Sequence, residues 1–151
     1  MPMIFIDTPT GQMQIQQEDD AIVRVEWATG ESQEPTPLLN EAKAQIGAYF
    51  DGGLYEFDLP LRVRGSEFQR RVCDAIYAIP FGETRGYGDL AADLGASAQA
   101  VGGGCGGNPI PLIIPCHRVL AANGLGGFSG QHGIETKVAL LRHEGAAGLL
   151  I

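Results

Sequence analysis

The spacing of apolar residues changes once along this chain of 151 residues, and this change constrains the fold more than any other feature. In the first part, β-forming residues alternate or cluster in three short segments, 3–7, 11–17 and 21–28. Turn-forming residues separate these segments at Thr8-Pro-Thr-Gly11 and at Glu18-Asp-Asp20. The pattern predicts a three-stranded antiparallel meander at the N-terminus.

From residue 37 onward, apolar residues recur at helical spacing instead. The first such stripe consists of Leu38, Ala42, Ile46 and Tyr49/Phe50. It predicts a helix over 37–50, which the Asp-Gly-Gly sequence at 51–53 ends. A meander followed by one helix predicts a small α/β unit. We therefore divide the chain into domains 1–60 and 61–151.

The second domain opens with helix signals. Ser66-x-x-Gln69 is a capping box, and the apolar stripe behind it ends at Pro80. The stripe consists of Phe68, Val72, Ile76 and Ile79, and Cys73 beside it is interpreted as core packing. A short helix closed by Gly95 follows, and Ser97 can cap another. Two short helices joined by a glycine-containing turn are typical of a helix-turn-helix.

Glycines interrupt the second of these helices at 102–104 and again at 106–107. Each glycine costs about 1 kcal/mol relative to alanine in a helix interior. The run has two interpretations. It is either a frayed helix that turns into a loop, or a surface without side chains that lets another backbone, such as that of DNA, approach closely.

Charge is distributed unevenly between the two domains. Residues 1–60 carry 11 acidic and 2 basic side chains, a net charge of −9, whereas residues 61–151 carry 7 acidic and 8 basic, a net charge of +1. The acidic part repels nucleic acid, and neither part has the basic stripe of a high-affinity DNA-binding protein. Any role on DNA must therefore depend on local contacts and shape.

The longest apolar stretch is far shorter than the roughly 18 residues that span a bilayer, and the N-terminus has no signal-peptide pattern. We therefore expect a cytoplasmic protein without a membrane partner. The cysteines, Cys73, Cys105 and Cys116, are too few and too widely spaced for a disulfide framework, and they form no zinc-binding pattern. We expect no metal.

The string Pro115-Cys-His-Arg118 follows the apolar run 110–115. A cysteine beside an imidazole, presented by a hydrophobic segment, indicates a nucleophile with a base next to it. The thiolate is the reactive form of cysteine, and a neighbouring histidine raises its fraction at neutral pH. Taken alone, however, most cysteines are simply small core residues.

Further motifs surround this string in order. They are Phe68-Gln-Arg-Arg-Val, Ile79-Pro-Phe-Gly-Glu-Thr, Tyr87, Ala100-Val-Gly, Gly107-Asn-Pro, Ile114-Pro-Cys-His-Arg-Val119, Gly127-Phe-Ser-Gly130 and Leu140-Leu-Arg-His-Glu-Gly145. Together they resemble the O6-alkylguanine-DNA alkyltransferases, also called methylated-DNA–protein-cysteine methyltransferases. The resemblance covers residues 61–147 densely and the N-terminal part more loosely.

The resemblance implies an α/β (α+β) fold. A small ribonuclease-H-like N-terminal domain has an antiparallel sheet plus a helix, and a mostly helical C-terminal domain carries a winged helix-turn-helix. It also implies a monomer without a cofactor that binds double-stranded DNA in the minor groove. The family transfers an alkyl group from O6-alkylguanine to a cysteine once and irreversibly, which is direct-reversal DNA repair. The lesion base is flipped out, because its O6 atom lies inside the base stack.

Catalytic roles follow from the same resemblance. Cys116 matches the alkyl acceptor, and His117 matches the base that deprotonates it through a bridging water. Glu144 matches the carboxylate that orients and charges the imidazole, although on sequence alone it reads as a surface residue. Asn108 matches the residue that braces the turn before the active-site strand. Tyr87 matches a phenol that crowds the target's phosphate and can donate a proton to the departing guanine.

Binding roles follow as well. The pocket wall and the loop that reads the guanine edge match Pro111, Val119, Phe128 and Ser129, and Phe128 stands where tyrosine is common. The DNA-facing helix contributes Ala98, Gln99 and Gly102. Gln99 stands where the family usually has the arginine that fills the gap left by the flipped base. Glutamine lacks the charge and the stacking guanidinium plane, so we expect weak affinity for duplex DNA.

Two readings from other classes remain open. One is a repurposed relative that acts as an alkyl-lesion sensor, a binding module without chemistry. Such relatives replace the acceptor cysteine, usually with tryptophan, so Cys116 argues against this reading. The other is a Cys-His-Glu hydrolase, in which the helix-turn-helix would have no purpose. Turnover would separate a hydrolase from a protein that reacts once.

Overall fold

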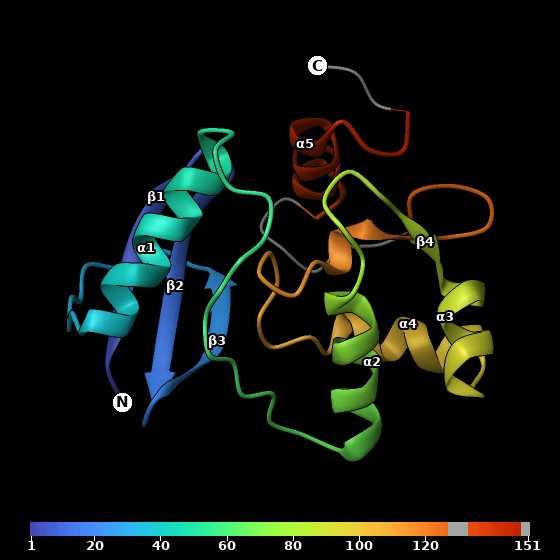
Figure 1. Ribbon diagram of the computed structural model, residues 1–151, viewed down its shortest axis with the longest axis horizontal. Helices are drawn as coiled ribbons and strands as arrows, with labels where there is room; N and C mark the ends of the chain where they lie inside the picture. Colours follow the sequence, from blue (N-terminus) through green and yellow to red (C-terminus); the bar gives the residue numbers. More distant parts are fainter. Residues whose placement is uncertain (127–132, 149–151) are drawn as a thin grey trace. The chain divides into compact units, whose positions relative to one another are not determined.

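The computed structural model describes residues 1–126 and 133–148 of the chain (Figure 1). The chain divides into two compact units, Met1–Arg62 and Val63–Ile151. The first unit extends to Arg62 because the backbone at 60–62 returns to the sheet: Ile22 N donates to Pro60 O, and Arg62 N donates to Ile22 O. Within the described residues, no helix is long and apolar enough to cross a membrane.

The first unit is built on an antiparallel sheet. Strands β1 (Met3–Thr8), β2 (Gly11–Glu18) and β3 (Ala21–Trp27) pair in chain order, which confirms the predicted meander. Ile4 lies opposite Ile15, and Ile15 lies opposite Val25, so buried residues align across the strands. Because side chains alternate between the two faces of a strand, this register collects the apolar residues on one face.

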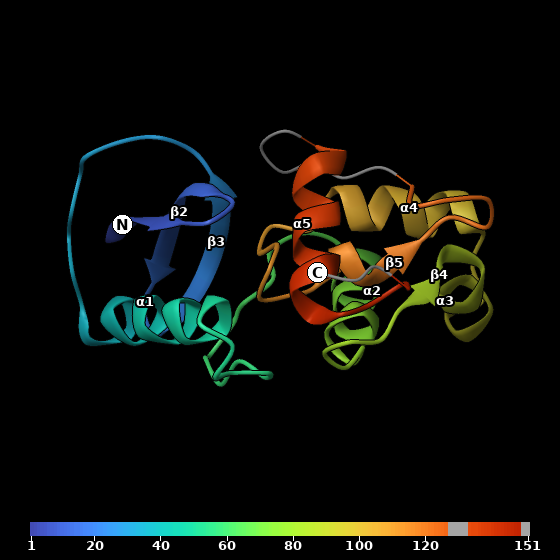
Figure 2. The same cartoon turned by 90° about the horizontal axis from the view of Figure 1, so that it is seen from above.

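Helix α1 (Pro37–Phe50) packs against this sheet, as Figure 2 shows from above. Thr36 Oγ1 accepts from Leu39 N and caps the helix at its start. The buried face consists of Leu39, Ala42, Ile46 and Tyr49. The predicted helix is confirmed, but its stripe was wrong at one position. Leu39 is fully buried whereas Leu38 is only partly buried, since a 3.6-residue period allows either neighbour to lead the stripe.

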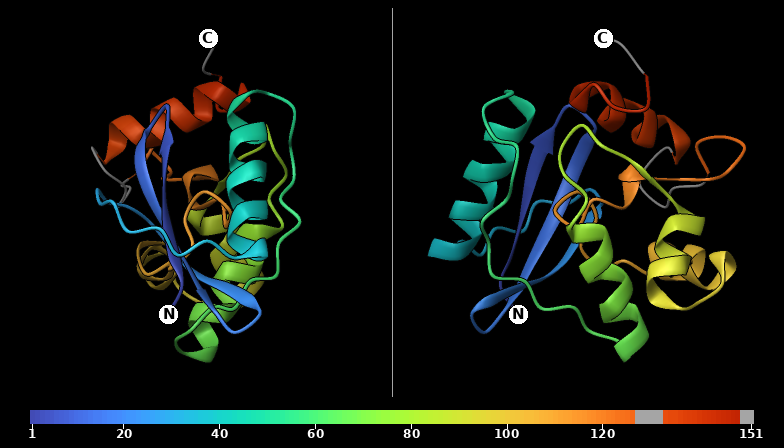
Figure 3. Two further views of the ribbon diagram at one scale, coloured as in Figure 1. Left: turned by 90° about the vertical axis from the view of Figure 1, so that its left-hand side faces the viewer. Right: turned by 45° about the vertical axis from the view of Figure 1, so that its right-hand side comes forward.

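The second unit is mostly helical. Its elements are α2 (Glu67–Tyr77), β4 (Arg85–Gly86), α3 (Tyr87–Leu94), α4 (Ala98–Gly106), the 3₁₀ turn η1 (Cys116–Arg118), β5 (Val119–Leu120) and α5 (Ile134–Glu144). Helices α2, α3 and α4 pack against one another (Figure 3), and β4 pairs with β5 in parallel. The predicted helix-turn-helix corresponds to α3 and α4. Gly95 closes α3 in the left-handed conformation, and Ser97 Oγ caps α4.

The capping box at the start of α2 is only half present. Ser66 Oγ accepts from Gln69 N, as predicted. The side chain of Gln69, however, donates from Nε2 to Gly104 O at 2.8 Å instead of returning to the cap. The carbonyl of Gly104 is buried and needs a hydrogen-bond partner more than the exposed backbone nitrogen of Ser66 does. The Gln69 amide therefore binds Gly104.

Helix α4 continues through the glycine run to Gly106, so the frayed-helix interpretation was wrong. One of these glycines is required by packing: a Cβ atom on Gly104 would lie 2.8 Å from a methyl group of Val72 on α2. At Gly102, Gly103 and Gly106, a Cβ atom would meet nothing within 4 Å. The absence of side chains there leaves the α4 backbone accessible.

Candidate active site

Cys116 lies at the start of η1, at the end of a buried loop. Every residue from Ile110 to Val119 is buried, and Cys116 itself is 5% exposed. Its backbone N donates to Ile114 O at 2.8 Å, and Arg118 N donates to Pro115 O at 2.9 Å. The predicted active-site strand is therefore wrong at Cys116–Arg118, because these backbone bonds wind the chain into a 3₁₀ turn.

Asn108 fixes the conformation of this loop. Its Oδ1 accepts from Ile110 N at 2.9 Å, and its Nδ2 donates to Ile114 O at 2.8 Å. This amide thus bridges both ends of the loop, which includes Leu112 in the left-handed region at φ 73°. Left-handed backbone is strained for leucine, so fixed partners are needed to maintain it.

Burial sets the protonation of Cys116. It raises the pKa of the thiol to about 11, although a hydrogen bond from Asn108 and the charge of Lys137 act in the opposite direction. The resting group at neutral pH is therefore a thiol. A base must remove its proton before or during the attack on an electrophile.

His117 is fully buried, and its two ring nitrogens have different surroundings. Nε2 lies 2.7 Å from Glu144 Oε2, whereas Nδ1 has no hydrogen-bond partner among the described residues. A carboxylate can only accept, so a neutral His117 must carry its proton on Nε2. The lone pair on Nδ1 is then available as a base.

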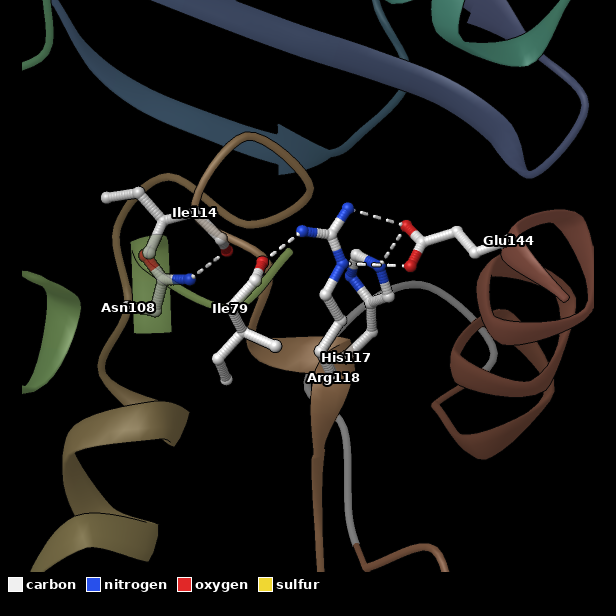
Figure 4. Close-up of polar contacts among 6 residues, drawn as sticks. All are labelled: Ile79, Asn108, Ile114, His117, Arg118 and Glu144. Atoms are coloured by element: carbon white, nitrogen blue, oxygen red, sulfur yellow. Dashed lines mark hydrogen bonds and ion pairs between the residues drawn. The ribbon is translucent and has the colours of Figure 1, made fainter. Parts of the chain in front are cut away.

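Glu144 is the last residue of α5, and its carboxylate is buried in the unit (Figure 4). Arg118 binds both of its oxygens: Nε donates to Oε1 at 2.8 Å and Nη2 donates to Oε2 at 3.0 Å. Burial acts to raise the pKa of Glu144, but His117 and Arg118 outweigh it and lower the pKa to about 2. His117, Arg118 and Glu144 form a buried group, called the charge cluster below.

Arg118 changes the interpretation of His117. Burial lowers the pKa of His117, the contact with Glu144 raises it, and the charge of Arg118 lowers it further. Because the net shift is downward from 6.5, His117 is neutral at pH 7. Glu144 favours the charged imidazole, as expected, but burial of His117, together with the charges of Arg118 and Lys137, outweighs this effect in the resting protein.

Sequence reasoning missed both Arg118 and Lys137. Lys137 on α5 is fully buried and donates from Nζ to Val119 O at 2.7 Å. Burial lowers the pKa of Lys137, and its charge acts to lower the pKa of Cys116. A signal for Arg118 was present, because an arginine inside a run of buried apolar residues requires a buried partner.

Matches to known families cover almost the whole chain. Residues 67–146 match the family described as "6-O-methylguanine DNA methyltransferase, DNA binding domain". Residues 1–63 match "6-O-methylguanine DNA methyltransferase, ribonuclease-like domain". The chain belongs to the 6-O-methylguanine DNA methyltransferase family. The resemblance that the motifs around Cys116 indicated is thereby confirmed.

Individual members of this methyltransferase family are similar over most of their length. The methylated-DNA–protein-cysteine methyltransferase of Mycolicibacterium paratuberculosis is 42% identical over 150 residues, covering 92% of this chain and 89% of that protein. The constitutive enzyme of that name from Bacillus subtilis is 38% identical over 152 residues, covering 91% of this chain and 92% of that protein.

A solved structure of the Mycobacterium tuberculosis O6-methylguanine methyltransferase has a TM-score of 0.85 and 38% identity, and the match covers 95% of this chain and 92% of that one. A structure of the M. tuberculosis protein OGT in complex with DNA has a TM-score of 0.84 and 41% identity, with 96% and 95% covered. These neighbours confirm the predicted α/β fold with a helical C-terminal part.

The structure places the remaining candidate residues of this methyltransferase at two locations. Ala98 and Gln99 are exposed in the first turn of α4, and Gly102 lies one turn further along. Pro111 and Val119 are buried on either side of Cys116 in the sequence. Phe128 and Ser129 lie outside the described residues.

Tyr87 begins α3 and is half-buried. Its ring lies 5.9 Å from Lys137 Nζ, and burial raises the pKa of its phenol. The group therefore retains its proton at neutral pH and can donate it. Cys73 and Cys105 are also buried free thiols, and burial raises the pKa of Cys105 to about 12.

Proposed function

We propose that this protein repairs DNA by direct reversal, transferring an alkyl group from O6-alkylguanine to Cys116 in a single turnover. Membership of the methyltransferase family supports the reaction class. The observation that carries the assignment to this site is the pairing of His117. Its Nε2 is bound to Glu144, its Nδ1 has no partner among the described residues, and the buried Cys116 precedes it in the chain.

The proposed reaction balances without a cofactor. The Cys116 proton moves to His117 Nδ1, directly or through a bridging water, as Sγ forms a bond to the alkyl carbon. The bond between that carbon and guanine O6 breaks, and its electron pair leaves with the guanine. The departing base takes a proton from the Tyr87 phenol, and Tyr87 recovers one from His117. The product is a neutral thioether, which has no hydrolytic exit, so each molecule reacts once.

DNA binding is assigned to the helix-turn-helix. The family model that covers α3 and α4 is that of a DNA-binding domain, and a similar solved structure contains DNA. On α4, exposed Ala98 and Gln99 and half-buried Gly102 form a surface with little side-chain bulk. Such a surface suits close approach to the minor groove, from which the lesion base would be flipped into the pocket.

We assign the other site residues as follows. Asn108 holds the loop that presents Cys116, and Pro111 and Val119 line the pocket for the flipped base. The proposal also includes a division of labour: the part before about residue 60 is an α/β domain, and the part after it binds DNA and transfers the alkyl group. We further propose that the protein acts as a monomer in the cytoplasm, where an acceptor thiol stays reduced.

Intact mass measured after incubation with duplex DNA containing O6-methylguanine tests this function. The expected result is a gain of one methyl group per molecule, which peptide mapping then places on Cys116. Cys116→Ser should bind the lesion DNA without gaining mass, and Cys105→Ser should react normally. A methyl group on Cys105 would overturn the site assignment.

The same experiment separates the alternatives. Binding of lesion DNA without any gain in mass would favour the sensor, although Cys116 argues against that class. Release of the alkyl group with repeated turnover would favour the hydrolase.

A further inference from the structure

Arg118 is a buried arginine whose guanidinium nitrogens all have specific partners. It is 6% exposed, and its guanidinium binds both oxygens of Glu144. The remaining nitrogen, Nη1, donates to Ile79 O at 2.6 Å just beyond the end of α2. Its carbon Cζ lies 5.9 Å from the centre of the Phe81 ring. Figure 4 shows the guanidinium and the imidazole meeting the same carboxylate.

These contacts determine the charge around His117. Among the described residues, the charged groups that act on it are Glu144 and Lys137 from α5 and Arg118 from η1, and Cys116 is its neighbour in the chain. Two of them are cations and one is an anion, so a proton on His117 would add a third positive charge at a buried position. A neutral imidazole avoids that cost, and its Nδ1 lone pair stays available.

We propose that Arg118 is a positioning residue that keeps His117 neutral and protonated on Nε2, so that Nδ1 can accept the thiol proton. It would act through Glu144, by orienting the carboxylate and by neutralising its charge. This inference rests on the proposed alkyl transfer, because it names the group that prepares the base for that reaction.

A purely structural role predicts something different. If Arg118 only ties η1 to the end of α2 and to α5, its removal would lower stability but leave the protonation of His117 unchanged. The pH dependence of transfer therefore distinguishes the two roles. Protonated His117 cannot accept a proton from Cys116, so the rate must fall on the acid side as His117 gains its proton.

The test uses the full chain and the free base O6-benzylguanine, which requires no DNA binding. The rate of benzyl transfer to Cys116 is measured against pH for the natural protein, Arg118→Met and Arg118→Lys. Removing the cation leaves Glu144 as an uncompensated partner of His117, so Arg118→Met should move the acid limb to higher pH by about one unit. Arg118→Lys retains the charge and should restore most of the natural profile.

A double variant keeps the test valid if Arg118→Met folds poorly. Arg118→Met combined with Glu144→Gln removes both charges, so no uncompensated carboxylate remains beside His117. Its acid limb should return to the natural position or below, at a lower rate. An acid limb that is the same in the natural protein and in Arg118→Met would overturn the proposal, as would an equal shift in Arg118→Lys.

Nitrogen-15 NMR of His117 in the natural protein provides a second measurement that needs no variant. The neutral tautomer protonated on Nε2 is expected at pH 7, and an imidazolium signal would overturn the proposal. Failure of the natural protein to take up the benzyl group would instead count against the proposed function. The NMR result would still decide the protonation state by itself.

Discussion

The two units of this protein have different cores. Among residues 1–126 and 133–148, all the buried polar and charged side chains belong to the second unit. They are Asn108, His117, Arg118, Thr136, Lys137 and Glu144. The buried face of the first unit consists of apolar and aromatic residues from the sheet and α1.

This difference shows where stability and chemistry lie. Burying apolar surface stabilises a fold by roughly 25 cal/mol per Å², without any need for matched partners. Burying charges gains little net stability, but losing one partner of a buried pair costs about 3–5 kcal/mol. The apolar core of the first unit therefore tolerates substitution more readily, whereas the buried charges of the second unit hold the reactive groups in one arrangement.

A substitution in the core of the first unit should lower stability strongly without changing activity. Ile15 is fully buried in β2, so Ile15→Ala should lower the free energy of unfolding by about 2–5 kcal/mol in urea denaturation. The rate of benzyl transfer per folded molecule should not change. Arg24→Ala is the control, because its ion pair with Glu26 is exposed and contributes about 1 kcal/mol at most. A slower reaction in folded Ile15→Ala would show that the first unit takes part in the chemistry.

Acid should lower the stability of the second unit, because its buried charged groups titrate at acid pH. Glu144 has its pKa lowered from 4.5 to about 2 and His117 has its pKa lowered from 6.5, so the unfolded chain binds more protons at acid pH. Their contribution to the free energy of unfolding is complete above pH 6.5. The part from Glu144 is on the order of 3 kcal/mol and is lost as the pH falls from about 4.5 to 2. Urea denaturation at several pH values measures it, and Glu144→Gln should flatten the acid part of the curve.

Removing the charge of Glu144 should also slow the reaction. Without the carboxylate, the imidazolium that forms during proton transfer loses its stabilising partner. Glu144→Gln should therefore reduce the rate of transfer from O6-benzylguanine about a hundredfold. The rate–pH profile measures this effect. An unchanged profile would mean that the carboxylate is only structural.

Adding charge to the exposed face of α4 should have a smaller effect. Gln99→Arg should tighten duplex binding about tenfold and steepen the dependence on salt by about one unit, through one new phosphate or base contact. Repair of duplex DNA should become faster, while transfer from the free base stays the same because no base is flipped. Unchanged duplex binding would indicate that this chain flips bases by another route.

The smallest expected effect concerns the glycines of α4. Gly103 is exposed with open space around its Cβ position, so Gly103→Ala should stabilise the protein by about 1 kcal/mol. The matched variant Gly104→Ala should destabilise it, because the new methyl group would lie 2.8 Å from Val72. Thermal unfolding compares the two. Equal effects would show that the α2–α4 contact adapts more easily than the distances indicate.

Local patterns predicted the first unit well, because its structure follows from local rules. The alternation over 3–28 determines three strands, and the stripe over 37–50 determines α1. In the second unit, the caps Ser66 and Ser97 lie next to the helices that they begin. The error at Leu38 was a shift of one residue. The end of α3 and the start of α4 were likewise marked by their own residues, Gly95 and Ser97.

The charge cluster could not be predicted in this way, because it depends on residues far apart in sequence. Arg118 meets Glu144 across 26 positions and Ile79 across 39. No local period connects them, and the resemblance to a family had directed attention to His117 and Glu144 alone. The 3₁₀ turn was missed for a related reason: the apolar run before Cys116 has the composition of a strand, but buried backbone bonds decide its conformation.

The tight winding of η1 has a consequence for how this segment can vary. A 3₁₀ turn advances by about 120° per residue, so Cys116, His117 and Arg118 project in three different directions from one short piece of backbone. Inserting or deleting a single residue here would rotate the guanidinium away from Glu144 and expose the imidazole to the wrong neighbours. The spacing of these three residues is therefore fixed, and an insertion or deletion within η1 should be more damaging than one in an exposed loop.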